Sequence, residues 1–373
     1  MRVGVNLLWL RPGEVGGTET YVRRVLGALG ESGGATGADT IELHLFGTNA
    51  AIEAVGPQPG VVVVHRAPDG FVKPARRVVF ERTWLRREMR SGLDVIHHPG
   101  GTVPFESEIP TAVTVHDLQP LDVPTNFGGV KRRFLASAIP QAVRRAQLVL
   151  TPSDWVSAQV RERFSLPGKA VRTVSAFAEP PEINLSGASP QIDALLGAGP
   201  VVLYPAMTMR HKNHRVLFRA FRLAQQQRPD LQLVCVGAVG RDHDEIQAAA
   251  AATSPRIHML GHVPKRDLEA LMGSSEMMVF PSRYEGFGLP VLEAQQRGLP
   301  VAASTAGALR EVAGHGARLY DPDDIDGWAQ AMGDPLDAAA LALLVAAGHE
   351  NARRYSAGTT ATQQRSAYLH LTA

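Results

Sequence analysis

Short apolar runs alternate with longer helix-like stretches along most of the chain, and these runs fall into two series. The first series consists of residues 3–8, 41–46, 61–64, 95–98, 111–115 and 148–150. The second consists of residues 201–204, 231–236, 257–260, 277–280 and 301–303. Residues 177–199 separate the two series and are rich in proline and glycine, which indicates a linker. Alternation of buried strands with helices is typical of parallel sheets, so the pattern predicts two α/β units joined by a hinge.

Length and composition agree with a two-domain globular protein. The chain has 373 residues, of which 45% are hydrophobic and 20% are charged. The single cysteine, Cys235, lies in an apolar run, which indicates a core residue and excludes an intrachain disulfide or a cysteine-based zinc cluster. The apolar run at residues 1–10 is too short for a signal peptide, and no run approaches the ~18 apolar residues of a membrane span. We therefore expect a cytoplasmic protein.

The formal net charge of +2 is too small to indicate a nucleic-acid partner. One helix-like segment, Lys73 to Arg90, nevertheless concentrates positive charge. Its cations are Lys73, Arg76, Arg77, Arg82, Arg86, Arg87 and Arg90, and its apolar residues are Val78, Trp84, Leu85 and Met89. A basic amphipathic helix could bind an anionic membrane surface or an acidic acceptor. We favour the alternative, a packed helix with a solvated arginine face, and keep peripheral contact with the inner membrane face as a second hypothesis.

The segment between the run at 277–280 and the next helix carries the strongest chemical signal. Gly286 and Gly288 form a tight loop in which backbone N–H groups can approach an anion. Pro290 suits the first turn of a helix. Glu285 then lies on the loop and Glu293 about one turn inside the helix, so both border the helix N-terminus, where phosphate binds readily. Amides for a phosphate and carboxylates for hydroxyls together suit a sugar nucleotide.

The string Pro281-Ser282-x-x-Glu285-Gly286-Phe287-Gly288-Leu289-Pro290-x-Leu292-Glu293-Ala294 resembles the signature of the retaining family 4 glycosyltransferases, which have the GT-B fold. The resemblance implies two Rossmann-like domains facing each other across a cleft, with a C-terminal helix that crosses back to the first domain. It assigns residues 1–180 and a helix at about 355–373 to an acceptor-binding domain, and residues 181–354 to a nucleotide-sugar donor domain. It also implies that Glu293 bonds the ribose, that Glu285 bonds the transferred sugar, and that the amides after Glu285, from Gly286 to Leu289, stabilise the diphosphate.

Three further loops resemble donor-binding loops of the family. Gly16 and Gly17 stand between the first run and a helix, without the G-x-G-x-x-G pattern of dinucleotide-binding proteins, and match the family's N-terminal loop. Lys212 matches the lysine of the family's basic motif. Many members carry an arginine where this chain has Ala206, and Arg210 is the candidate replacement. Val263 lies in a segment that resembles the loop for the nucleobase.

His116 follows the run at 111–115, at the strand end where ligand-facing residues concentrate. A lone histidine there is more often structural, but the resemblance implies contact with the donor sugar near the reaction centre. His97 and His98 end the preceding strand and could line the acceptor side. No His-x-x-x-His helix is present and no Asp-x-Asp is placed to chelate a metal diphosphate, so we expect neither metal nor cofactor.

The sequence thus predicts a retaining, metal-independent transferase that uses a nucleotide-diphospho-hexose. GDP-mannose is the favoured donor and UDP-linked hexoses are second. The acceptor would be a glycan, a lipid-linked sugar or a small molecule. Two alternatives stay open: a GT-B nucleotide-sugar epimerase, and a catalytically silent subunit that binds sugar nucleotides.

Overall fold

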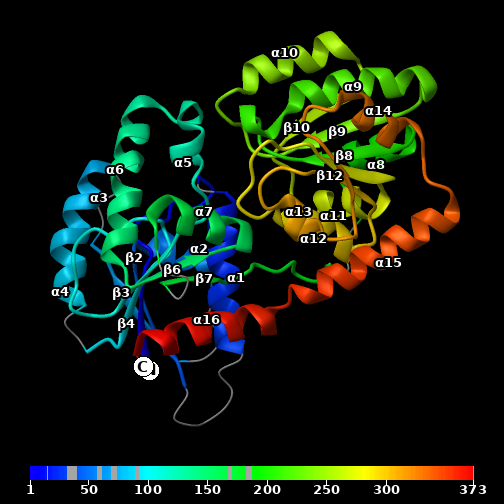
Figure 1. Ribbon diagram of the computed structural model, residues 1–373. Coiled ribbons are helices and arrows are strands. Elements are labelled where there is room, and N and C mark those ends of the chain that lie inside the picture. Colours follow the sequence, from blue (N-terminus) through cyan, green and yellow to red (C-terminus); the bar gives the residue numbers. More distant parts are fainter. Residues whose placement is uncertain are drawn as a thin grey trace. The chain divides into compact units, whose positions relative to one another are not determined.

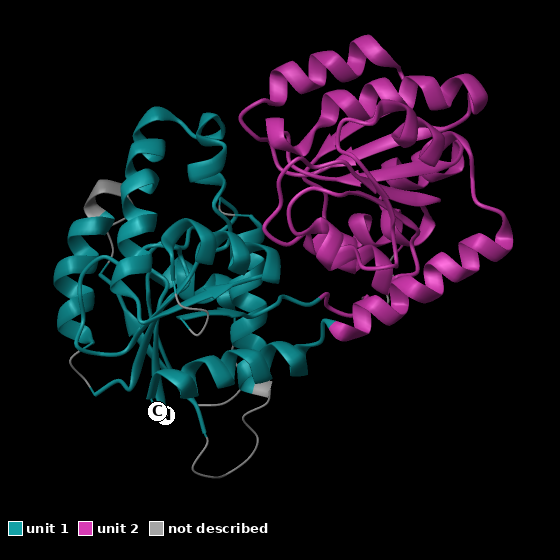
Figure 2. Cartoon of the chain, viewed as in Figure 1, with its two compact units in different colours: residues 1–177, 355–373 teal, residues 178–354 magenta. Residues whose placement is uncertain are grey.

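The computed structural model describes residues 1–14, 16–31, 40–56, 61–68, 74–89, 92–166, 170–181 and 187–372, and the side chains of residues 31, 61 and 74–76 are not described. The chain forms two compact units (Figures 1 and 2). Unit 1 consists of Met1–Phe177 and Tyr355–Ala373, and unit 2 of Ala178–Arg354. The chain therefore enters unit 2 near residue 178 and returns to unit 1 near residue 355.

Unit 1 is built on a seven-stranded parallel sheet in the order β3-β2-β1-β4-β5-β6-β7. Its strands are β1 (Arg2–Asn6), β2 (Glu42–Gly47), β3 (Val61–Arg66), β4 (Val95–His98), β5 (Thr111–Thr114), β6 (Leu148–Thr151) and β7 (Val171–Thr173). From β1 the chain builds the sheet outward on one side through β2 and β3, and then on the other side from β4 onward. Adjacent strands β1 and β4 therefore flank the topological switch point, where open α/β sheets bind their ligands.

The helices of unit 1 include one stretch of π-helix. They are α1 (Gly17–Glu31), α2 (Asn49–Val55), α3 (Pro74–Phe80), the π-helix η1 (Glu81–Leu85), α4 (Arg86–Glu88), α5 (Gln119–Asp122), the 3₁₀ turn η2 (Pro124–Asn126), α6 (Gly129–Arg145), α7 (Asp154–Phe164) and α16 (Ala357–Thr372). Among the described residues of unit 1, side-chain caps begin α2, α7 and α16. Thr48 accepts from the Ala51 N–H at 3.2 Å, Ser153 from the Val156 N–H at 3.2 Å, and Ser356 from the Thr359 N–H at 3.1 Å.

The last helix, α16, follows unit 2 in sequence but packs on unit 1, beside α1 in Figure 1. The buried Tyr368 hydroxyl lies 2.8 Å from His97 Nδ1, and Thr360 Oγ1 donates to the Ser175 carbonyl at 2.8 Å. This placement agrees with the C-terminal helix expected for the fold.

Unit 2 has a six-stranded parallel sheet in the order β10-β9-β8-β11-β12-β13, so β8 and β11 flank its switch point. Its strands are β8 (Val201–Pro205), β9 (Gln232–Val236), β10 (Ile257–Gly261), β11 (Met277–Phe280), β12 (Val301–Ser304) and β13 (Arg318–Tyr320). Its helices are α8 (Pro190–Gly197), the 3₁₀ turn η4 (Arg210–Lys212), α9 (His214–Gln227), α10 (His243–Thr253), α11 (Lys265–Ser274), α12 (Leu289–Gln296), α13 (Leu309–Ala313), α14 (Ile325–Gly333) and α15 (Ala338–Arg354). The core is dominated by Tyr204, Phe218, Phe221, Phe280 and Trp328, and Cys235 is buried in it as expected.

All eleven apolar runs of the sequence form strands, but the described residues contain two further strands. β7 and β13 are three residues long, lie at sheet edges and carry arginines, so they have no apolar run to reveal them. The predicted linker at 177–199 is wrong in part, because it contains α8. Pro190 occupies the first helical turn, and Ile192 is buried against the unit 2 core, so tertiary packing stabilises a helix there.

The basic segment is described from residue 74 to residue 89, so Lys73 and Arg90 lie outside the described residues. Its apolar face is packed inside unit 1: Leu85 and Met89 are buried with Phe80 and contact Trp84. The exposed side chains there are Val79, Arg82, Thr83, Arg86 and Arg87. Among the described helices no single one is long and apolar enough to cross a membrane. The pair Ile325–Gly333 and Ala338–Thr372 reaches that length and apolarity only when taken together, and it is bent by 110°.

Candidate functional site

Glu285 lies on the loop that joins β11 to α12, at the carboxyl end of a strand that flanks the switch point of unit 2. Its backbone is held by the turn at Gly307, where the Ala308 N–H donates to the Glu285 carbonyl at 3.0 Å. Gly307 has φ +62°, and a Cβ added there would lie 2.5 Å from the Glu285 carbonyl oxygen. Only glycine fits this approach without strain. The position of Glu285 therefore depends on a turn that follows the next strand, β12.

Lys212 meets Glu285 from the other strand of the switch point, at the end of the loop that follows β8. Lys212 Nζ lies 2.5 Å from Glu285 Oε1, and the two side chains are 14% and 13% exposed. The same ammonium lies 5.5 Å from the centre of the Phe280 ring, within reach of a cation–π interaction. Such limited exposure weakens solvent screening, so this pair is stronger than an ordinary surface ion pair.

The loop after β8, which carries Arg210 and Lys212 and is called the basic loop here, is joined to the Glu285 loop after β11 mainly by Asn213. Its backbone is left-handed, with φ +66°, which asparagine tolerates better than most residues. Its Nδ2 donates to the Pro281 carbonyl at 3.1 Å and to the Pro322 carbonyl at 2.6 Å. The Tyr204 hydroxyl bonds the Lys212 carbonyl, and the Arg283 N–H donates to the His211 carbonyl at 2.8 Å. Sequence reasoning missed this positioning role of Asn213, although an asparagine at a strand-to-helix turn indicates a left-handed backbone.

Glu293 is the fifth residue of α12, about one turn inside the helix as predicted, and its side chain is partly buried. Its carbonyl accepts from Arg297 Nη1 at 2.8 Å, and Arg297 is held by two bonds to Glu269 at 2.7 and 2.6 Å. The loop residues Gly286, Phe287 and Gly288 and the first helical residue, Leu289, lie between Glu285 and Glu293. Gly288 has φ +104° and turns the chain into the helix. One loop and the helix that follows therefore carry most of the predicted donor-binding residues.

The electrostatics of the basic loop leave its charge on Lys212 and Arg210. Burial, together with the neighbouring Lys212 charge, lowers the pKa of His211 to about 4. Burial likewise lowers the pKa of His214 to about 3, again with help from Lys212. Both histidines are therefore neutral at pH 7. The Arg210 side chain is exposed, and the Arg210 backbone N–H donates to Asp242 Oδ2 at 2.8 Å. Among the described residues no contact joins the Arg210 guanidinium to Glu285.

The remaining predicted residue of unit 2 is Val263, on the loop after β10. Its side chain packs partly buried against the unit 2 core. Gly261, which ends β10, has φ +67° and accepts from the Gly237 N–H at 2.8 Å. No contact with the Glu285 loop is described for Val263, so a role in binding a base stays a prediction.

The other predicted residues belong to unit 1. Gly16 has φ +56°, Gly17 begins α1, and a Cβ added at either position would meet no described atom within 4 Å. The neighbouring Val15 lies outside the described residues. His116 Nε2 donates to the Pro99 carbonyl at 2.7 Å, and the His116 ring stands edge-on to Tyr21. Burial lowers the pKa of His116 to about 4, so it is neutral and keeps a lone pair on Nδ1.

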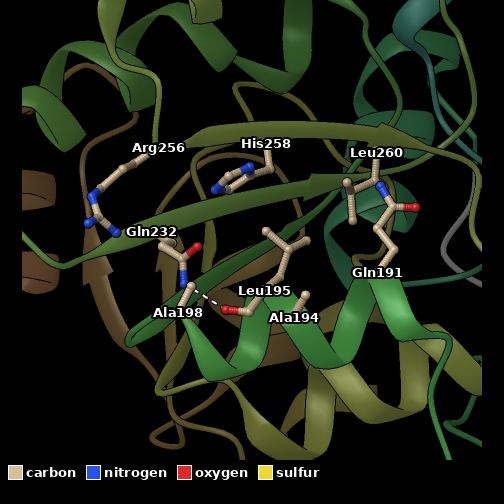
Figure 3. Close-up of a pocket in the computed structure, with 8 residues that line it drawn as sticks. All are labelled: Gln191, Ala194, Leu195, Ala198, Gln232, Arg256, His258 and Leu260. Atoms are coloured by element: carbon tan, nitrogen blue, oxygen red, sulfur yellow. Dashed lines mark hydrogen bonds between the residues drawn. The ribbon is translucent and has the colours of Figure 1, made fainter.

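A separate cavity of about 440 Å³ lies between α8 and strands β9 and β10 (Figure 3). It is lined by Gln191, Ala194, Leu195, Ala198, Gln232, Arg256, His258 and Leu260. The Gln232 amide crosses to α8 and donates to the Leu195 carbonyl at 2.8 Å, as the dashed line shows. None of the predicted site residues lines this cavity. Among the described residues, no group of three histidine, cysteine or carboxylate side chains could hold a metal ion.

Two family models match most of the chain. Residues 15–180 match the model described as Glycosyltransferase Family 4, and residues 199–337 match the model described as Glycosyl transferases group 1. Among related sequences, O-antigen chain mannosyltransferase B of Escherichia coli is 30% identical over 252 residues, which are 66% of this chain and 65% of that protein. The chain therefore spans just under two thirds of this relative's length.

Solved structures with low sequence identity share the fold over nearly the full length. Sucrose-phosphate synthase from Thermosynechococcus elongatus has a TM-score of 0.75 at 21% identity, covering 100% of this chain and 99% of that chain. Anabaena HepE in complex with UDP-glucose has a TM-score of 0.71 at 21% identity, covering 99% of both chains. At such identities the likeness shows the fold alone.

Proposed function

The chain belongs to the family 4 glycosyltransferases, also described as glycosyl transferases group 1, and has the GT-B fold; from this premise we propose a retaining, metal-independent hexosyltransferase. In this proposal a hexose moves from a nucleotide-diphospho-sugar to a hydroxyl of a glycan, lipid-linked or small-molecule acceptor. Mannose is the favoured hexose, because the related E. coli protein is named a mannosyltransferase. UDP-hexoses are the second choice, because HepE, which shares the fold, was solved with UDP-glucose.

The observation that carries the proposal is the Lys212–Glu285 pair at the start of α12. The two residues come from the loops after β8 and β11, which flank the switch point of the unit 2 sheet. Amides before and at the start of α12 would take the diphosphate with help from the helix dipole. Glu285 would bond a hydroxyl of the transferred sugar, and Glu293 the ribose hydroxyls. One positive charge, two carboxylates and a helix N-terminus match the chemistry of a sugar nucleotide.

In the proposed reaction Lys212 and the loop amides stabilise negative charge that grows on the diphosphate as the glycosidic bond breaks. The acceptor hydroxyl attacks from the face that the diphosphate leaves, so the anomeric configuration is retained, and the departing diphosphate takes the hydroxyl proton. His116, neutral through burial, is proposed to contact the donor sugar as a hydrogen-bonding group.

Metal independence is supported by the contacts of the acidic residues near the basic loop, because their carboxylates bond other groups of the protein. Asp321 and Asp323 form an Asp-x-Asp sequence around Pro322, whose carbonyl bonds Asn213. The Asp323 carboxylate pairs with Arg283, and Asp321 Oδ1 accepts from the Asp323 N–H at 2.9 Å. These carboxylates thus have partners within the protein, and the positive charge for a diphosphate would come from Lys212 and Arg210.

The proposal is tested with purified protein, GDP-mannose or UDP-glucose as donor, and methyl α-mannoside as acceptor. We expect transfer to give an α-linked product by NMR, at a rate that survives excess EDTA. Nucleoside diphosphate affinity, measured by calorimetry, should fall by about 1.5–3 kcal/mol in Glu293→Ala, the range for a hydrogen bond to a charged group. A β-linked product would contradict retention, and loss of activity in EDTA with recovery in Mg²⁺ or Mn²⁺ would contradict metal independence.

The same assay separates the alternatives. An epimerase would convert the sugar nucleotide when no acceptor is present, whereas a silent subunit would bind nucleotide and turn nothing over. Unchanged nucleotide affinity in Glu293→Ala would remove that residue from the donor site.

A further inference from the structure

The cavity between α8 and the edge of the unit 2 sheet is lined by residues that the proposed transferase reaction does not use (Figure 3). Its volume of about 440 Å³ lies within the range of small-molecule sites. One wall is the edge strand β10, which ends the strand order of this sheet. Arg256 directly precedes β10, and His258 and Leu260 lie in it. Alternate residues of a strand point to the same face of a sheet, so these three side chains form one wall of the cavity.

The opposite wall is one face of α8. That face consists of Gln191, Ala194, Leu195 and Ala198. Their spacing of three or four residues places them on one side of the helix. Two of the four are alanines, whose small side chains leave space between the helix and the sheet. Gln232 of β9 holds the two walls at this separation, because its Nε2 donates to the Leu195 carbonyl at 2.8 Å and to the Gly199 carbonyl at 3.0 Å.

Two side chains at the cavity have polar atoms that no described residue bonds. His258 Nε2 is buried, and among the described residues it has no hydrogen-bond partner. Both bonds of the Gln232 amide use its nitrogen, which leaves Oε1 as an acceptor. Figure 3 shows this nitrogen turned to α8 and the oxygen turned away from the helix. Buried polar atoms nearly always have a partner, so the His258 nitrogen indicates a place for a hydrogen-bonding group.

Arg256 brings a positive charge to the same wall. Its Nη1 donates to the Asp230 carbonyl at 3.2 Å, and among the described residues no carboxylate pairs with its guanidinium. A guanidinium has five N–H donors, so most of them are available to an anion. Burial and the Arg256 charge lower the pKa of His258, which keeps that ring neutral at pH 7. One cation beside neutral hydrogen-bonding groups favours an anion over a cation.

We propose that this cavity is a binding site for a small organic anion with an apolar body. Arg256 pairs with the anionic group, and His258 and Gln232 form hydrogen bonds beside it. Leu195 and Leu260, together with the two alanines of α8, contact the apolar body. An inorganic anion lacks the apolar body and a neutral ring compound lacks the charge, so neither satisfies both walls. None of the residues proposed to bind the donor lines the cavity, which makes this a second site on unit 2.

Three probes separate the two features of the ligand. 8-Anilinonaphthalene-1-sulfonate (ANS) has aromatic rings and a sulfonate, N-phenyl-1-naphthylamine has the same rings without the charge, and methanesulfonate has the charge without the rings. Fluorescence titration of the purified full chain measures the affinity for the two ring compounds, and calorimetry measures that for methanesulfonate. We expect saturable binding of ANS, weaker binding of the neutral rings and no measurable binding of methanesulfonate. The binding of ANS should persist in excess GDP or UDP.

Arg256→Gln and Ala194→Trp test the two walls separately. Arg256→Gln should raise the Kd of ANS about tenfold, as expected for loss of a charge-assisted hydrogen bond, and change that of the neutral rings less than about twofold. Ala194→Trp places an indole in the cavity and should abolish saturable binding of both ring compounds. The matched controls are Arg219→Gln on α9 and Ala248→Trp on α10, two exposed positions that do not line the cavity. Both controls should bind ANS as the wild type does.

Unchanged ANS affinity in Ala194→Trp would overturn the proposal, because the probe would then bind elsewhere. Absence of ANS binding by the wild type would overturn it too, as would displacement of ANS by GDP or UDP. Equal losses of ANS and neutral-ring affinity in Arg256→Gln would show that the cation does not select the ligand. The thermal midpoint reports folding of each variant, and if Ala194→Trp does not fold, the selective loss of ANS affinity in Arg256→Gln decides. None of these outcomes depends on transferase activity, so the proposed function is tested separately.

Discussion

At the scale of single residues, the Lys212–Glu285 pair couples two roles that sequence reasoning treated separately. Each side chain is mostly buried, and an unpaired charge in such a place is strongly unfavourable. The pair therefore holds both side chains in position at the start of α12. It also means that a change at either residue affects its partner. Arg210 is different, because it is exposed and the described residues offer its guanidinium no carboxylate partner at Glu285.

We predict that Lys212→Ala lowers kcat by about 10²–10³, comparable with the loss of an important electrostatic stabiliser. Its thermal midpoint should also fall modestly, because Glu285 loses its counter-charge. Arg210→Ala should give a smaller loss of kcat. The size of that loss measures how far Arg210 replaces the arginine that is absent at position 206. Initial rates at saturating donor measure these effects.

The matched control is Arg215→Ala, which removes a cation from an exposed pair with Glu245 at the start of α9. Exposed pairs contribute little, so kcat and the thermal midpoint should stay near wild type. If Lys212→Ala keeps wild-type kcat while Arg210→Ala loses it, Arg210 is the main cation and the assignment of Lys212 is wrong.

At the scale of elements, backbone turns place the side chains of the site. Gly307 follows β12 and lies against the backbone of Glu285, while Asn213 joins the loop after β8 to the loop after β11. Both positions have positive φ, which most residues adopt only with strain. The geometry of the Lys212–Glu285 pair therefore depends on turns that themselves carry no charged side chain.

We predict that Gly307→Ala displaces the Glu285 loop, because the new Cβ would lie 2.5 Å from a backbone oxygen that cannot rotate away. The variant should lose about 1–3 kcal/mol of stability and reduce kcat about tenfold or more. Gly187→Ala is the control, since Gly187 has a similar φ of +73° but no described atom within 4 Å of the added Cβ. Denaturant midpoints and initial rates should therefore separate the clash from the strain of positive φ. Equal effects of the two substitutions would show that the contact with Glu285 is unimportant.

At the scale of the whole molecule, both units bury neutral histidines beside their switch points. Burial lowers the pKa to about 3 for His97, His98 and His214, and to about 4 for His116 and His211. In the unfolded chain the same groups have pKa values of about 6.5. Between these values the unfolded chain binds more protons than the folded protein, so stability rises with pH in this interval.

The expected result is a thermal midpoint that stays level above about pH 7 and falls as the pH drops from about 6.5 toward 4. Unfolding at pH 5.5 should take up protons, which calorimetry in buffers of different ionisation enthalpy measures directly. Release of protons at that pH, or a midpoint that rises on acidification, would contradict the assignment of these histidines as buried and neutral.

The sequence by itself determined the features that local patterns carry. Eleven apolar runs identified eleven strands, because a strand buried on both faces is apolar along its length. The string from Pro281 to Ala294 identified the loop and α12 together with their two glutamates, since glycine and proline mark such turns locally. The sequence did not predict strands β7 and β13, because edge strands need no apolar run. It did not predict helix α8 either, because the prolines and glycines in and around it resembled those of a linker.

Tertiary structure alone decided which distant side chains meet. Lys212 and Glu285 are 73 positions apart, and Asn6 is 75 positions from Glu81 and 92 from His98. In the sequence Glu81 lies among the arginines of the segment from Lys73 to Arg90, which we expected to be a packed helix with a solvated arginine face. In the structure Glu81 is buried and bonds Asn6 at the end of β1. The physical reason is that residue type and spacing report local backbone preference. Contact and burial, by contrast, depend on which strands lie next to each other in a sheet. The spatial order of the strands therefore determined which polar groups meet at neighbouring strand ends.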